Sequence, residues 1–146
     1  MTTPHCGGVL VGQPHQRLSE GLRGWLRASF REVFMVADRP SLIEGAHRLQ
    51  PMLMLVDQAL AEGSVATLLA DLRAQAPHSR TLLLSDCDHA GFDAAALAAG
   101  AAAVVHKASL AAELQAAVDA VLAVGSFSSP ARHPPVRPAS AQETGR

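Results

Sequence analysis

The sequence is poor in the residues that mark several protein classes. Its 146 residues include two cysteines, no tyrosine and 3% aromatic residues, and the formal net charge is −1. The two cysteines, Cys6 and Cys87, make neither a disulfide framework nor a metal-ligand spacing, which is typical of a reducing compartment. The small net charge gives no general argument for nucleic-acid binding.

Long apolar runs and targeting signals are also missing. The first eight residues lack the basic-then-apolar pattern of a secretion signal. The longest apolar run, residues 94–105, is too short to span a bilayer and contains Gly100. Aliphatic residues are abundant instead, since 49% of the chain is hydrophobic and 17% is charged. We therefore expect one ordinary domain with a core of Leu, Val and Ala, located in the cytoplasm.

Five short apolar runs alternate with five segments of helical spacing. A strand–helix alternation of this kind predicts an α/β fold, in which a parallel sheet carries helices on both faces. We expect Asp88 to cap the fourth helix, which ends at Gly100, and Ser109 to cap the fifth. The five runs predicted to be strands are residues 8–12, 32–36, 52–57, 81–85 and 102–105.

The two ends of the chain differ from the middle in composition. Residues 1–7 are expected to form a flexible N-terminus, and residues 8–125 the domain. Residues 126–146 are rich in proline and serine and almost without apolar residues. This composition predicts a disordered tail or a linker.

Polar residues stand at the ends of three predicted strands. Asp57 ends the third strand, Ser85 ends the fourth, and Lys107 follows the fifth. Because the carboxyl ends of parallel strands share one edge, these side chains should converge. A carboxylate can form an acyl phosphate whose oxygens a hydroxyl and an ammonium group bind, so the set suits phosphoryl transfer. Each residue alone could simply mark a strand end, whereas the three in this order favour a functional origin.

This order of residues resembles the receiver domain of two-component response regulators, in the style of the LuxR-type regulators. The resemblance covers residues 8–124 and implies a flavodoxin-like (βα)5 doubly wound parallel sheet with strand order 2-1-3-4-5. It also implies that Asp57 is the phosphoacceptor, Ser85 the switch hydroxyl and Lys107 the phosphate-binding cation. The segments that carry it are VLVGQPHQRLSEGLRGWL (9–26), PMLMLVD (51–57), TLLLSDCD (81–88) and AGAAAVVHKAS (99–109).

The sequence departs from the receiver pattern at the metal position. Receivers carry an acidic pair after the first strand to hold Mg²⁺, and here these places are Gln13 and Pro14. Mg²⁺ prefers carboxylates, and each lost charge removes about 4 kcal/mol of attraction at roughly 4 Å and an effective dielectric near 20. Glu62 and Asp86 are near enough to the site in sequence to be considered as substitute ligands, but neither stands at a ligand position of the family. We expect no metal, and we expect Lys107 to pair directly with Asp57.

A second departure concerns the output of the switch. Receivers usually carry an aromatic residue on the fifth strand, and here that place is Val104, whose χ1 is stiff. The loop after Asp57 also lacks the proline usual in the family. We therefore expect that the domain neither binds Mg²⁺ nor signals through a rotamer change of the residue at position 104.

Three other residues near the predicted site have ordinary interpretations. His15 and His106 could suggest a general base or a metal pair, but no third ligand accompanies them, so we interpret them as partly exposed strand-end residues. Cys87 has no basic neighbour in sequence and is interpreted as an ordinary thiol.

Three functions fit these patterns, and the first is preferred. It is a degenerate receiver that is not an enzyme and acts as a homodimer or by docking a partner protein. The second is a working receiver that takes a phosphoryl group from a histidine kinase onto Asp57 with Mg²⁺. The third is a flavodoxin-like domain that binds a small ligand, although no glycine-rich loop supports it. Contact with DNA is expected only through a separate output domain. No helix-turn-helix pattern follows residue 126, so such a domain was either lost or belongs to a longer parent regulator.

Overall fold

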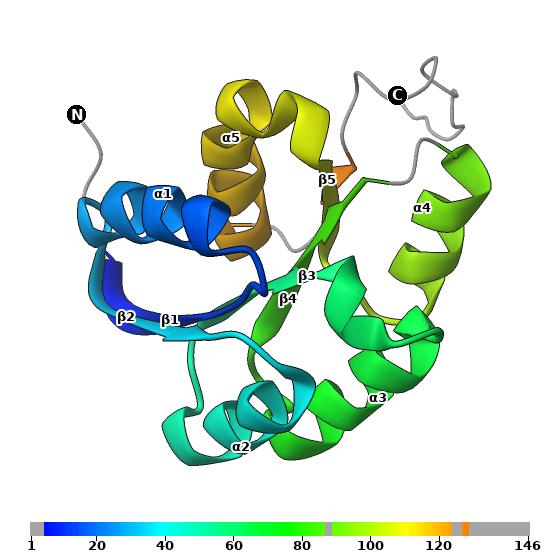
Figure 1. Ribbon diagram of the computed structural model, residues 1–146, viewed down its shortest axis with the longest axis horizontal. Helices are drawn as coiled ribbons and strands as arrows, with labels where there is room; N and C mark the ends of the chain where they lie inside the picture. Colours follow the sequence, from blue (N-terminus) through cyan, green and yellow to red (C-terminus); the bar gives the residue numbers. More distant parts are fainter. Residues whose placement is uncertain (1–4, 87–88, 124–126, 129–146) are drawn as a thin grey trace.

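A parallel sheet with strand order β2-β1-β3-β4-β5-β6 runs through the middle of the molecule (Figure 1). The structure is a computed structural model, and it describes residues 5–86, 89–123 and 127–128. Every pair of neighbouring strands is parallel. The first five strands confirm the predicted flavodoxin-like order 2-1-3-4-5. The strands are β1 (His5–Gly12), β2 (Phe30–Val36), β3 (Leu53–Asp57), β4 (Arg80–Ser85), β5 (Ala103–His106) and β6 (Phe127–Ser128).

Helices cover both faces of the sheet (Figure 1). One face packs against α1 and α5, and the other packs against α2, α3 and α4. Two short 3₁₀ turns follow inner strands, η1 (Gln58–Ala61) after β3 and η2 (Lys107–Ser109) after β5. The helices are α1 (Gln16–Arg27), α2 (Arg39–Leu49), α3 (Val65–Gln75), α4 (Ala90–Ala98) and α5 (Leu110–Ala123).

The central strand β3 is apolar without alternation because both of its faces are covered. Leu53 and Leu55 belong to the core beneath α1 and α5, whereas Met54 and Val56 belong to the core beneath α2, α3 and α4. All four side chains are at most 1% exposed. A strand buried on both faces places its last residue, Asp57, at the point where the core meets the edge of the sheet.

Local capping sets the start of two helices on the side of α2. The Asp38 carboxylate accepts a hydrogen bond of 2.8 Å from the Ser41 backbone N–H at the start of α2. The Ser64 hydroxyl oxygen accepts one of 3.1 Å from the Thr67 N–H at the start of α3. Such caps satisfy backbone donors that have no partner within the first helical turn.

Several predicted boundaries need correction. Strand β1 begins at His5 rather than Gly8, because His5 pairs with Phe30 ahead of an irregular step in the register. Part of the predicted flexible N-terminus is therefore a strand, and residues 1–4 lie outside the described residues. Strand β6 pairs with β5 inside the predicted tail, whereas residues 126 and 129–146 lie outside the described residues.

The fourth helix also starts differently from the prediction. Its N-cap is His89, whose Nδ1 accepts a hydrogen bond of 3.0 Å from the Gly91 N–H. The predicted cap, Asp88, lies outside the described residues. Ser109 belongs to η2, directly before α5. Among the described residues, no helix combines the length and apolarity needed to cross a membrane.

Candidate functional site

The three residues predicted to converge lie at the carboxyl edge of the sheet, where Asp57 and Lys107 are in direct contact. Asp57 is the last residue of β3, Ser85 is the last of β4, and Lys107 directly follows β5. The strands are neighbours in the sheet, and Ser85 pairs in register with His106. Asp57 and Ser85 are 0% exposed. We call Gln13, Asp57, Ser85 and Lys107 together the carboxyl-edge site.

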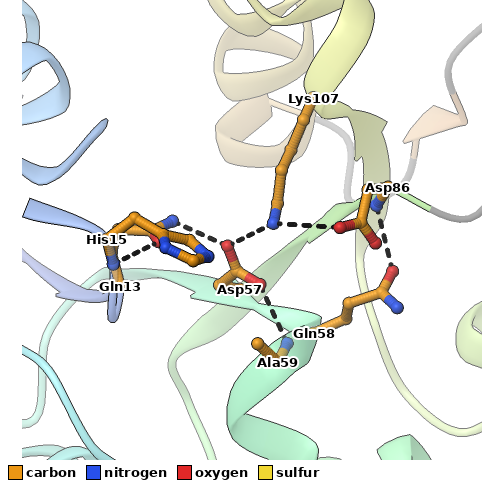
Figure 2. A network of polar contacts seen from close by, with 7 residues as sticks. All are labelled: Gln13, His15, Asp57, Gln58, Ala59, Asp86 and Lys107. Carbon is orange, nitrogen blue, oxygen red and sulfur yellow. Dashed lines mark hydrogen bonds and ion pairs between the residues drawn. The ribbon is translucent and has the colours of Figure 1, made fainter. Parts of the chain in front are cut away.

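Asp57 and Lys107 form the ion pair expected from the sequence. The Lys107 Nζ lies 2.6 Å from the Asp57 Oδ2, and the Lys107 side chain is 18% exposed. The same Nζ lies 3.6 Å from the Asp86 Oδ2 (Figure 2). Asp86 is exposed, so the closer and fully buried Asp57 is the principal partner. A charged group in this position needs such a partner because burial removes its hydration.

Gln13 is part of this network and is not a vacant metal position. Its side chain is buried, and its Nε2 donates a hydrogen bond of 2.8 Å to the Asp57 Oδ2. Its Oε1 accepts a hydrogen bond of 3.0 Å from the His15 backbone N–H (Figure 2). The reversed amide would set oxygen against oxygen at Asp57 and N–H against N–H at His15. The two partners therefore fix which end of the amide faces the carboxylate.

The second oxygen of Asp57 is engaged as well. The Ala59 N–H donates a hydrogen bond of 2.8 Å to the Asp57 Oδ1, so that Asp57 caps η1. Oδ2 therefore receives an amide and an ammonium donor, and Oδ1 receives a backbone donor. These three contacts replace the hydration that the Asp57 carboxylate loses on complete burial.

A second contact joins the loops around the site. The Gln58 Oε1 accepts a hydrogen bond of 3.1 Å from the Asp86 N–H, which connects η1 to the segment after β4 (Figure 2). Asp86 in turn approaches Lys107. The loops that follow β3, β4 and β5 are thus linked through Gln58, Asp86 and Lys107.

The side chains present do not fit the Mg²⁺ that the receiver resemblance implies. Mg²⁺ needs oxygen ligands, preferably carboxylates. Gln13 turns its NH₂ group toward Asp57 and uses its oxygen on His15, while Pro14 has no ligand atom in its side chain. Asp57 is then the one carboxylate among these positions. Within residues 5–86, 89–123 and 127–128, no group of three or more His, Cys, Asp or Glu could hold a metal ion.

The remaining sequence candidates fall at the margin of the site. His15 is exposed, and His106 is 8% exposed at the end of β5, so His106 is buried rather than partly exposed as predicted. Glu62 is exposed beyond η1 with φ +53°, and Asp86 is exposed beside Lys107. Cys87 lies outside the described residues.

Val104 occupies the predicted switch position on β5 and is completely buried. It pairs with Leu83 and packs in the core beneath α2, α3 and α4. A buried valine presents no ring that could exchange between an inward and an outward rotamer.

Two features of the site region were missed in the sequence. The first is the donor role of Gln13, since the sequence indicates only the loss of a metal ligand at this position. The second is Asp93 in the first turn of α4, which is 2% exposed. The alanine-rich composition of α4 concealed Asp93. A single carboxylate among small residues forms no sequence pattern that would predict its burial.

Comparison with solved structures assigns the fold to that of response-regulator receiver domains. No protein-family model and no curated protein sequence matches the chain. A LuxR-family response regulator from Aurantimonas sp. matches with a TM-score of 0.75 and 24% identity, over 85% of this chain and 89% of that chain. The receiver domain of NarL from Mycobacterium tuberculosis matches with a TM-score of 0.71 and 27% identity, over 82% and 98%.

Longer chains match as well. The response regulator RcsB from Salmonella typhimurium matches with a TM-score of 0.74 and 19% identity, over 88% of this chain and 62% of that chain. A further RcsB structure contains two dimers bound to two parallel DNAs. The chain thus spans less than two thirds of RcsB, and its matched part has the receiver fold.

Proposed function

We propose that this chain is a receiver domain that does not undergo conventional Mg²⁺-dependent phosphorylation at Asp57. It acts as a regulatory module in signal transduction, through contact with a second copy or with a partner protein, and it is not an enzyme. The receiver fold supports the general class. The finer part of the proposal rests on the surroundings of Asp57.

The observation that carries the proposal is the complete enclosure of the Asp57 carboxylate. A phosphoacceptor must present an oxygen lone pair to the incoming phosphorus atom, with cations to offset the charge that develops. Asp57 is 0% exposed, and both of its oxygens already accept hydrogen bonds or contact a cation. Gln13 and Pro14 provide no anionic ligand for the metal. Phosphorylation would require the Gln13 contact to break, and nothing in the donor set would replace it.

The proposed mode of action is contact between proteins. RcsB forms dimers on DNA in one of the similar structures. By analogy, we propose that this receiver pairs with itself or with another protein in the cytoplasm. Any contact with DNA belongs, in this proposal, to a separate output domain rather than to the receiver.

One arrangement favours a second candidate, a working phosphoacceptor receiver. Asp57, Ser85 and Lys107 retain the places that a receiver uses for phosphoryl transfer, at the ends of three neighbouring strands. Under this alternative a histidine kinase would supply the phosphoryl group, and Mg²⁺ would be needed.

Exposure to a small phosphodonor separates the two candidates. The chain is incubated with acetyl phosphate and Mg²⁺, and intact-mass spectrometry follows the formation of a phospho-adduct. We expect no adduct and no change in Trp25 fluorescence with beryllofluoride. A stable adduct that D57A abolishes would contradict the proposal and establish the working receiver. The matched control is Q13D/P14D, which restores the acidic pair and should take up Mg²⁺.

A further inference from the structure

The amino edge of the sheet carries a cavity far from Asp57. Strands β3, β4 and β5 are parallel, so their first residues lie at the edge opposite to the carboxyl-edge site. The cavity has a volume of about 480 Å³ and lies where α3 and α4 end, between Arg73 on α3 and Leu97 on α4. This volume falls within the range of about 300–1,000 Å³ found for small-molecule sites. We call it the amino-edge cavity.

The floor of the amino-edge cavity is apolar and belongs to the core. Met54 is 1% exposed, Leu69 is 3% exposed and Ala101 is 5% exposed. Met54 lies on the central strand, Leu69 lies on α3, and Ala101 precedes β5. These side chains are almost fully covered, so a ligand in the cavity would touch only a small apolar area at its floor.

The charged residues at the cavity have the same sign. Arg73 and Arg80 line it with exposed side chains, His78 lines it as well, and no Asp or Glu of the described residues does. Neither arginine makes a side-chain hydrogen bond or ion pair with another described residue. Two guanidinium groups that line one cavity offer several N–H donors to an anion bound there.

The Arg73 side chain packs against the backbone at Gly100. Its guanidinium lies over Gly100, where a side-chain Cβ would collide with it, and Gly100 has φ +120°. Glycine at position 100 thus allows the backbone to turn out of α4 and leaves room for the guanidinium. The end of α4 can account for one nearby cation through the helix dipole. It does not account for Arg80, which comes from β4.

We propose that the amino-edge cavity binds a small organic anion. Its phosphate, sulfonate or carboxylate group would contact Arg73 and Arg80, and the remainder of the ligand would lie in the open part of the cavity. Guanidinium groups form paired, charge-assisted hydrogen bonds with such anions. The proposal does not depend on the phosphorylation state of Asp57, because the cavity and Asp57 lie at opposite edges of the sheet.

The test uses 1-anilinonaphthalene-8-sulfonate, an aromatic sulfonate, as the probe. Its affinity is measured by fluorescence, and its position by amide chemical shifts in ¹H–¹⁵N spectra of the full chain. We expect shifts confined to the strand starts near Arg80 and to residues 97–102. R73Q/R80Q should weaken binding at least tenfold, and R73K/R80K should retain part of the affinity.

The matched control is R17Q/R27Q, which removes the same charge from α1 on the other face of the sheet. It should change the affinity by less than twofold. Equal weakening by both double variants would mean that the probe senses only bulk charge, and the proposal would be wrong. Shifts that map away from the cavity would also overturn it. If R73Q/R80Q does not fold, R80Q alone serves, because Arg80 takes no part in the Arg73–Gly100 packing.

Discussion

Gln13 donates a hydrogen bond of 2.8 Å from its Nε2 to the Oδ2 of Asp57. The contact gives the buried carboxylate a partner with partial positive charge. A neutral amide supplies only a partial charge, and Lys107 at 2.6 Å supplies the rest. Asp57 is therefore satisfied without metal, and this relationship leads to the first two predictions.

Restoring the acidic pair should convert the site into one that needs metal. In Q13D/P14D, two additional carboxylates face Asp57, and their mutual repulsion should lower the free energy of unfolding in the presence of EDTA. Added Mg²⁺ should recover about 1.4 kcal/mol at roughly ten times its Kd, because it binds only the folded state. Urea denaturation with and without Mg²⁺ measures this. The unsubstituted chain should show no such dependence, and a Mg²⁺ effect of similar size in it would contradict the proposed function.

Removing the cation at position 107 should be costly. In K107M the buried Asp57 keeps Gln13 and Ala59 but loses the one positive charge that the described residues place in contact with it. We expect a loss of about 3 kcal/mol of stability, at the lower end for a broken buried ion pair because Lys107 is partly exposed. A double-mutant cycle with D57N measures the coupling, which should be at least about 1 kcal/mol because the two groups are in contact. Strictly additive effects would mean that Asp86, at 3.6 Å, is the effective partner of Lys107.

The N-cap of α2 should make stability depend on pH in the acidic range. Hydrogen bonds from the Ser41 backbone N–H and hydroxyl lower the pKa of Asp38 below its usual value of 3.8. The contribution of this charge is therefore complete above the unfolded-state pKa and is lost as the pH falls through the lower, folded-state pKa. In D38N, which keeps an oxygen acceptor but no charge, the difference from the unsubstituted chain should be constant near neutral pH. It should shrink below pH 3.8. Thermal unfolding of both chains across this pH range measures the difference in stability. A difference that grows as the pH falls would contradict the prediction.

Gly100 and Gly21 should respond in opposite directions to alanine. Gly100 has φ +120° and lies beneath the Arg73 guanidinium, so G100A should destabilise by more than about 1 kcal/mol. Gly21 lies within α1 with open space around its missing Cβ, so G21A should stabilise by about 0.5–1 kcal/mol. Chemical denaturation compares the two. A neutral G100A would mean that the turn after α4 can relax, and the account of the Arg73 position would fail.

The sequence predicted the sheet and the convergence of the site residues because both follow from local patterns. Apolar runs that end on Asp57 and Ser85 specify strands buried on both faces, and parallel pairing then brings their ends together. The direct contact of Lys107 with Asp57 could be predicted by the same reasoning, since a buried carboxylate needs a cation when metal ligands are absent.

Other details depend on contacts between distant segments and could not be predicted. The orientation of the Gln13 amide follows from the His15 N–H, whose position is set by the turn into α1. The early start of β1 depends on pairing with Phe30 across an irregular register. The burial of Asp93 depends on how α4 packs, and its composition does not reveal this.

The two-sided burial of β3 has a consequence for folding. Leu53 and Leu55 belong to one core, and Met54 and Val56 belong to the other. If either helical layer detaches, water reaches one side of the strand that both cores share. The layers should therefore melt as one cooperative unit, and the amides of β3 should exchange with solvent only through global opening.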